Sequence, residues 1–345
     1  MKKVLGAVSV FVASVVGAGF ATGKEIVVFF SRSNPCLVFV LLFATFSLLF
    51  WAILHLSILT NCFDVHCLLG KLLKNFDFCY DVFALLICLV MTSSMIAGSN
   101  EILCMCFNFS TPFFGVATAF LVALLFFAKS QKAVDFLCRC TTLLIVIFVA
   151  ILFVSSKKNA PQFDGIFNTI FSVGSYASFN VICSLGALCN QAKTMSKKQA
   201  VATSLISAFI LSATCSLMIV ILNPNSKLLP TLELVRHQPA YWFGVATVSL
   251  SILSTLWANA IPLVERVESK VKNKPFAIFL VFGTGWLLSN VGFDNIVKVF
   301  YPIVSLVCLA TSIYLIFQLC SVLGKIKALN KVFLRVQPNK KGSSN

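Results

Sequence analysis

Charged residues are scarce in this 345-residue chain, and acidic residues are the scarcest. Only 11 residues are Asp or Glu and three are His, and charged residues of both signs make up 11% of the sequence. A soluble globular domain carries about 25% charged residues. Hydrophobic residues make up 59% here, and the mean hydropathy is +0.96. We therefore predict an all-α polytopic membrane protein without a sizeable soluble domain.

Catalytic and nucleotide-binding patterns are also missing. The sequence contains no GxxxxGK[ST] phosphate-binding loop, which disfavours an ATP-driven pump. His55, His66 and His237 are scattered, and no Ser/His/Asp set stands out. Most of the 14 cysteines stand singly in apolar runs, where cysteine behaves as a small hydrophobic residue. We therefore expect no enzyme, no disulfide framework and no resident cofactor, apart from the sodium ion considered below.

Long apolar runs fill most of the chain. A bilayer core about 30 Å thick needs about 20 apolar residues per helical span. Polar, Pro and Gly residues separate the runs and predict ten spans, roughly 4–31, 36–59, 78–106, 112–128, 133–154, 166–190, 199–222, 241–264, 275–291 and 295–320. The run after MKK also imitates a secretory signal peptide. Apolar sequence resumes beyond Lys24 and Glu25, which favours a first span that is retained.

The net charge of +16 is explained by topology rather than by nucleic-acid binding. Short cytoplasmic loops collect Lys and Arg. With the N-terminus inside, the outer loops hold only Arg32, Lys157, Lys158, Lys227 and Arg236. This asymmetry predicts a multi-pass protein of the cell inner (plasma) membrane with both termini cytoplasmic. The basic tail, 321–345, would lie near anionic membrane lipid.

The stretch GAGFATGKEI, Gly17 to Ile26, interrupts the first apolar run. Glycine costs about 1 kcal/mol in a helix interior relative to alanine. The glycines would suit close helix packing, or a break that lines a watery cavity. Lys24 and Glu25 favour the break, because ionisable residues inside a span are costly and usually functional. The N–H groups of the outer half-helix would then favour an anion such as a carboxylate, and the carbonyls of the inner half would favour a cation.

Ten spans divide into two halves, 1–154 and 165–320. An odd number of spans in each half gives the halves opposite orientations, which is the geometry of an inverted repeat. The stretch VGSYASFN, Val173 to Asn180, interrupts the sixth run at a place that corresponds to the break in the first. We therefore predict that spans 1 and 6 are both broken and face each other.

The first-span motif resembles that of a known family. GAGFATGKEI, followed by Phe29 and Phe30, is similar to the glycine-rich motif of the YkvI-type bacterial membrane proteins, which belong to the amino acid-polyamine-organocation (APC) transporter superfamily. The ten-span outline matches along nearly the whole chain. This resemblance implies a LeuT-like fold of five plus five spans, in which helices 1 and 6 are unwound at their centres.

The resemblance also implies a sodium site. In many members of that fold, sodium lies between backbone carbonyls of span 1 and paired hydroxyls of span 8. Aligned on Gly17 to Gly19, the candidate ligands are the carbonyls of Ala13, Val16 and Ser251 and the hydroxyls of Ser254 and Thr255. The alternative is that these hydroxyls bond the backbone of their own helix, as Ser and Thr commonly do.

The substrate would lie between the two breaks. The candidate substrate-binding residues are Gly17, Ala18, Gly19, Phe20, Gly23, Tyr176, Ser178, Asn180 and Ser93. Ordinary interhelical hydrogen bonding is the alternative for Ser93 and its neighbours on span 3. Glu25 is the candidate coupling residue: it could carry a proton, bind a substrate amine, or pair with Lys24 or Lys298.

The function expected from these features is secondary active transport of a small organic solute, an amino acid or a related amine. Alternating access driven by sodium or protons would be the mechanism. The alternative is a ligand-sensing membrane subunit that keeps the fold but transports nothing, because the break itself contains no clear coupling acid. The expected partners are a small-molecule substrate and membrane lipid. The sequence leaves the substrate, the ion, the direction of transport and the oligomeric state open.

Overall fold

The computed structural model describes residues 2–73, 77–107, 113–127, 131–155, 165–223 and 229–336, and every regular element in these ranges is a helix. The helices are α1 (Lys2–Val15), α2 (Ala18–Thr22), α3 (Lys24–Phe30), α4 (Pro35–Thr60), α5 (Val65–Leu73), α6 (Asp77–Phe107), α7 (Phe113–Phe127), α8 (Gln131–Ser155), α9 (Ile166–Cys183), α10 (Leu185–Ala192), α11 (Lys197–Ile221), α12 (Pro230–Val235), α13 (Tyr241–Val271), α14 (Lys274–Ser289), α15 (Phe293–Asn295), the π-helix η1 (Ile296–Phe300) and α16 (Tyr301–Val336). The all-α prediction is confirmed for these residues.

Several helices begin at residues that satisfy the free N–H groups of the first turn. Asn34 precedes α4, and its side chain accepts hydrogen bonds from the N–H groups of Cys36 and Leu37. Ser196 and Gln199 form a reciprocal capping box at the start of α11. Such caps stabilise a helix terminus by about 1 kcal/mol, so local sequence fixes these starting points independently of packing.

Six helices of the described residues are long and apolar enough to cross a membrane, judged by length and composition. They are Pro35–Thr60, Val82–Phe107, Ile166–Cys183, Lys197–Ile221, Tyr241–Val271 and Phe293–Gly324. Four shorter apolar helices, Lys3–Val15, Phe114–Leu124, Leu143–Val154 and Lys274–Ser289, coincide with the other expected spans. A multi-pass α-helical membrane protein follows from these helices, and the count of ten spans stays a prediction.

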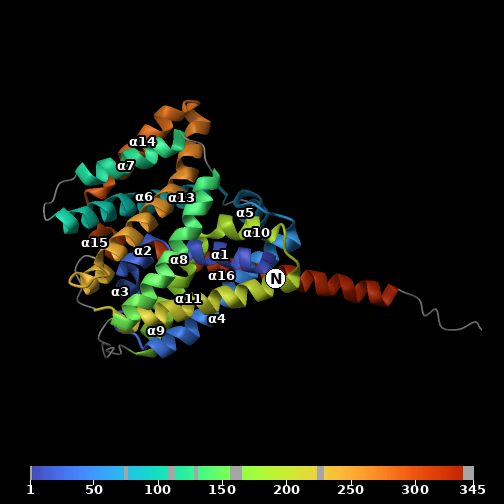
Figure 1. The fold of residues 1–345 in the computed structure, drawn as a ribbon. Coiled ribbons are helices and arrows are strands. Elements are labelled where there is room, and N and C mark those ends of the chain that lie inside the picture. The colour runs from blue at the N-terminus through green and yellow to red at the C-terminus, as the bar shows by residue number, and fades with distance from the viewer. Residues whose placement is uncertain are drawn as a thin grey trace, which may run out of the picture.

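The helices form one bundle around α1 and α13 (Figure 1). Two long pairs run through it, since α4 packs along α11 and α6 packs along α13. α7 and α14 contact each other at one edge of the bundle, while α4, α9 and α11 lie at the opposite edge (Figure 1). α1 contacts both α9 and α10, so the first and sixth predicted spans meet in the interior.

Two details differ from the sequence-based expectations. The last helix, α16, continues to Val336, beyond the predicted end of the span at residue 320, and projects from the bundle (Figure 1). Cys62 and Cys67 form a disulfide between α4 and α5, although no disulfide was expected. The predicted link between the two halves, 155–163, lies outside the described residues except for Ser155.

Candidate functional site

The first span is interrupted at two glycines. α1 ends at Val15, and the N–H of Gly17 turns back to the carbonyl of Val15 at 2.8 Å. Gly23 separates α2 from α3 with a left-handed φ of +76°, a conformation that glycine adopts without steric cost. A Cβ on Gly23 would also lie 2.8 Å from Leu222 Cδ1. The predicted break in span 1 is therefore present, and Gly23 is required on both conformational and packing grounds.

Glu25 stands in the first turn of α3 and folds back over the break. Its side chain is 3% exposed, and its carboxylate lies against Gly19, where a Cβ would overlap it. Contacts among the described residues include no hydrogen bond or ion pair to this carboxylate. Gly19 therefore has no side chain at the one place where the acidic group needs room.

Thr255 of α13 connects the eighth predicted span to the break. Its hydroxyl accepts a hydrogen bond from the N–H of Ala18 at 3.2 Å, and a Cβ on Gly17 would lie 3.1 Å from the same oxygen. The Asn259 side chain in turn donates to the carbonyl of Thr255 at 2.9 Å. The predicted approach of span 8 to the break is thus observed, and Asn259 extends it.

The five candidate sodium ligands gather around the end of α1 and the middle of α13. They are neutral oxygens, which suits a hard cation. Ser254, however, donates its hydroxyl proton to the carbonyl of Ser251 at 2.9 Å, so these two candidate ligands bond each other. For Ser254 this is the backbone-bonding alternative described above. The sodium site stays a prediction, in which Ala13, Val16 and Thr255 would supply the remaining oxygens.

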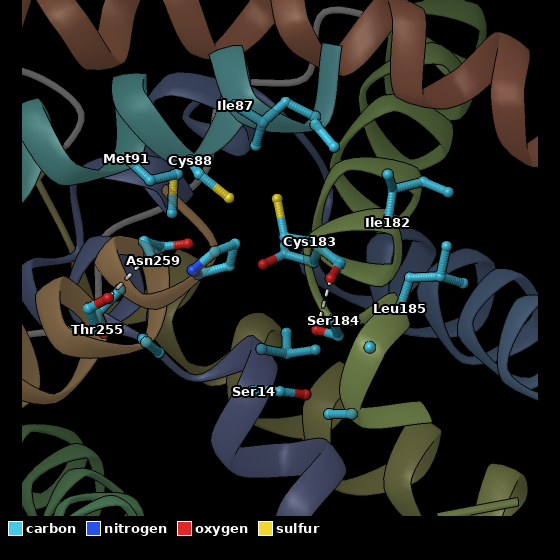
Figure 2. Close-up of a pocket in the computed structure, with 18 of the residues that line it drawn as sticks. Ser14, Ile87, Cys88, Met91, Ile182, Cys183, Ser184, Leu185, Thr255 and Asn259 are labelled. Carbon is cyan, nitrogen blue, oxygen red and sulfur yellow. Dashed lines mark hydrogen bonds between the residues drawn. The ribbon is translucent and has the colours of Figure 1, made fainter. Parts of the chain in front are cut away.

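A cavity of about 920 Å³ joins both interrupted spans. Figure 2 shows its walls: Ser14 of α1, Cys88 and Met91 of α6, Cys183 at the end of α9, and Thr255 with Asn259 on α13. The cavity reaches the surface near Asn190, Gln191, Glu265, Arg266 and Ser269, where α10 and α13 end. These ends are the ones that the sequence predicts to face the cytoplasm.

The charge of the cavity is concentrated at its inner end. Among its described lining residues, Asp, Glu, Lys, Arg and His are represented by Glu25 at the break and by Glu265 and Arg266 at the mouth. Glu265 is exposed, whereas Glu25 is buried. The inner part is therefore a mostly apolar chamber with one acidic group at its end.

The cavity brings together about half of the residues that the sequence singled out. Its described lining includes Ala13, Gly17, Ala18, Gly19, Glu25, Asn180, Ser254 and Thr255. The others lie behind this lining: Val16, Phe20, Gly23, Ser93, Tyr176, Ser178 and Ser251. For the latter set, direct contact with a solute in this conformation is not favoured.

Tyr176 and Ser93 illustrate why these residues are remote from the cavity. The Tyr176 ring is fully buried, 5.0 Å from the ring of Phe30 and 5.4 Å from that of Phe29, measured between centroids. It therefore supports the outer half of span 1 from behind. Ser93 donates its hydroxyl proton to the carbonyl of Leu89 at 2.7 Å. This bond lies within one helix, so neither the substrate role nor the interhelical alternative describes it.

The interruption of span 6 is not where the sequence placed it. α9 is continuous through Val173 to Asn180, and the chain departs from the helix at Ser184. The Ser184 hydroxyl donates to the carbonyl of Asn180 at 2.7 Å, and its N–H donates to the same carbonyl at 3.1 Å. The small and polar residues of 173–180 are accommodated by burial within the bundle, since most are under 9% exposed. The prediction of a break at 173–180 is therefore wrong.

A charged cluster lies beyond the break, on the side away from the cavity mouth. Lys24, which is 0% exposed, pairs with Asp294 at the start of the last predicted span. Lys298, one helical turn later, pairs with the other oxygen of Asp294 at 2.7 Å. Glu101 lies within electrostatic range of Lys24 and Asp294. The proposed pairing of Glu25 with Lys24 or Lys298 is therefore wrong, because both lysines bind Asp294.

Sequence analysis missed several polar residues of the cavity, including Ser184, Asn190, Gln191, Asn259 and Arg266. Asn259 had a usable signal, since it follows Thr255 by four positions and shares its helix face. The others depend on where α9 is interrupted, which the sequence pattern mislocated.

No protein-family model matches this chain, and no curated protein matches it. The family resemblance of the first-span motif therefore stays a proposal, and functional inference depends on the geometry described above.

Proposed function

We propose that this protein is a secondary active transporter of a small organic solute, an amino acid or a related amine, that works by alternating access. The carrying observation is the cavity, which runs from the basic end of the bundle to the break in span 1 and stops at Glu25. Beyond that point the Lys24–Asp294 pair ties span 1 to the last predicted span. Such a cavity, open on one side and closed on the other, is what one state of a transporter requires.

The packing of the helices supports an inverted repeat. In this proposal α1 to α3 form span 1, α9 and α10 form span 6, and each span has a counterpart five positions later. α1 packs on α11 as α9 packs on α4, and α1 packs on α8 as α9 packs on α16. Likewise α6 packs on α7 as α13 packs on α14, and α11 on α8 as α4 on α16. Exchanging the two halves preserves these contacts, as a two-fold pseudosymmetry would.

The same features support the LeuT-like member of the APC superfamily suggested by the first-span motif. Spans 1 and 6 are both interrupted, at Gly17 and Ser184, and both line the cavity. The positive-inside pattern would place the cavity mouth in the cytoplasm. The conformation then corresponds to an inward-facing state of a ten-span carrier.

The outer closure has a physical basis in its ion pair. Lys24 is buried and would be strongly destabilised if its partner were removed, because an uncompensated buried charge is costly. Asp294 is 32% exposed, so water can reach the pair from its own side. Opening toward the outside would require this pair to separate while the inner mouth closes.

Transport in reconstituted vesicles tests the proposal. Purified protein would be supplied with radiolabelled amines and amino acids, with a sodium gradient or a pH gradient imposed in turn. Concentrative uptake that collapses when the gradient is dissipated is the expected result. Saturable binding in detergent combined with no flux of the same compounds would contradict transport and indicate the ligand-sensing subunit instead.

A further inference from the structure

We propose that Glu25 binds the ammonium group of an apolar primary amine, and that the amine exchanges for a proton on the same carboxyl group. This inference rests on the transporter function proposed above and specifies its substrate class and coupling. It begins from the position of Glu25, which lines the cavity, is 3% exposed and contacts no partner charge among the described residues.

An ionised carboxylate without a partner is expensive in apolar surroundings. It becomes favourable only when it takes up a proton or receives a cation. The structure provides neither a lysine nor an arginine for this purpose, because Lys24 and Lys298 both bind Asp294. A cation that reaches Glu25 must therefore enter through the cavity.

The groups that surround Glu25 do not supply a positive charge. α3 packs against α2, α9, α11 and η1. The titratable neighbours within electrostatic range of Glu25 are Tyr176 and Cys183 of α9, Cys215 of α11 and Tyr301 of α16. η1 contributes Lys298, which is held by Asp294 of α15, and α2 contains no titratable residue. Tyrosine and cysteine side chains are uncharged in their ordinary state at neutral pH.

The rest of the cavity favours an amine over an amino acid. Near Glu25 the walls are largely apolar, with Ile87, Met91, Phe179 and Ile182 among them. The N–H of Ala18, a donor that the break would offer to a carboxylate, is bound to Thr255. The chamber thus has an acceptor for an ammonium group and a surface for an apolar body, whereas its cationic residue, Arg266, is at the mouth.

The exchange balances charge and atoms. In the empty cavity Glu25 holds a proton as a neutral carboxylic acid. When an alkylammonium ion arrives, the carboxyl O–H bond breaks, the proton passes to cavity water, and the carboxylate pairs with the ammonium group. The site carries no net charge in either condition. Amine therefore moves in one direction and a proton in the other, one for one.

Isothermal titration calorimetry of the full chain in detergent tests this exchange. Three probes of similar shape are 2-phenylethylamine, L-phenylalanine and 3-phenylpropionate, which are a cation, a zwitterion and an anion at pH 7. We expect 2-phenylethylamine to bind tightest and 3-phenylpropionate not to bind. Titrations in two buffers with different ionisation enthalpies should show release of roughly one proton per amine bound. Affinity for the amine should fall as the pH is lowered, because protons compete for Glu25.

Variants make the assignment specific. Glu25→Gln should weaken amine binding by at least about thirtyfold and abolish proton release, while Glu25→Asp should keep proton release. Glu268→Gln, which neutralises an acid of α13 outside the described cavity lining, should bind like the wild type. Amine binding without proton release, equal binding in Glu25→Gln, or no amine binding at all would each overturn the inference. Concentrative uptake of phenylalanine or 3-phenylpropionate would do so while leaving the transporter proposal intact, whereas absence of any flux would remove the latter.

Discussion

The carboxylate of Glu25 occupies the space beside Gly19 that a side chain on residue 19 would fill, and Glu25 Cγ lies only 2.8 Å from the position of such a Cβ. This relationship explains the order of residues in GAGFATGKEI. Gly17 leaves room for Thr255, Gly19 leaves room for Glu25, and Gly23 turns the chain so that Glu25 can reach back. Each glycine thus serves a separate contact.

Replacing Gly19 with alanine should disturb Glu25 first. The new methyl group would displace the carboxylate, and we expect weaker binding of 2-phenylethylamine together with a loss of about 1–3 kcal/mol from overpacking. Thermal unfolding in detergent and calorimetry measure the two effects. Gly283→Ala is the matched control, because nothing lies within 4 Å of its Cβ position; it should be neutral or slightly stabilising. Equal behaviour of the two variants would show that Gly19 is not a contact site.

The hydroxyl of Thr255 gives a second prediction. Thr255→Val keeps the shape but leaves the buried N–H of Ala18 without its acceptor, which should cost about 1–3 kcal/mol. Ser254→Ala removes only a bond within its own helix and should cost less. Thermal unfolding in sodium and in choline buffers separates the roles. If sodium stabilises the wild type and neither variant loses that stabilisation, the sodium site is not at these residues.

The sequence predicted the helical class, the position of most apolar helices and the break at Gly17, because composition and glycine spacing are local properties. It also placed Glu25 and Thr255 at the site. It mislocated the interruption of span 6, since Val173 to Asn180 are small and polar yet packed inside a continuous helix. A single chain does not reveal whether such residues face a cavity or a neighbouring helix.

The Lys24–Asp294 pair was missed for a related reason. The two residues are 270 positions apart, and their contact depends on how the outer half of span 1 meets the last predicted span. From sequence, Asp294 stood only at a span end, where an acidic residue needs no special explanation. Long-range pairing of this kind follows from tertiary packing and not from a local pattern.

Tyr176 and Asn180 test the corrected boundary of the cavity. Tyr176→Phe retains the buried ring and removes an oxygen whose observed contact is the Cys215 thiol at 3.8 Å. It should leave binding of 2-phenylethylamine nearly unchanged. Asn180→Ala alters the cavity lining and removes a donor to the Tyr176 carbonyl, so binding should weaken. A larger effect of Tyr176→Phe than of Asn180→Ala in calorimetry would place the solute behind the lining described here.

Breaking the outer ion pair should open the protein toward the side on which the pair lies. Asp294→Asn leaves the buried Lys24 without its partner, and loss of one partner from a buried pair costs about 3–5 kcal/mol. Because Asp294 is partly exposed, we expect the lower end of this range. The closed outer side is destabilised by this amount relative to an open one, so the population of outward-facing molecules should rise.

Cys183 reports this change, because it is exposed to the cavity in the present conformation (Figure 2). A membrane-impermeant maleimide, followed by peptide mass spectrometry, measures its modification from each side of sealed vesicles. In the wild type we expect modification mainly from the side of the cavity mouth, and in Asp294→Asn a gain from the opposite side. Lys298→Ala is the control, since its side chain is 54% exposed and a surface pair contributes about 0–1 kcal/mol. If Asp294→Asn and Lys298→Ala label alike, the ion pair does not hold the outer side closed.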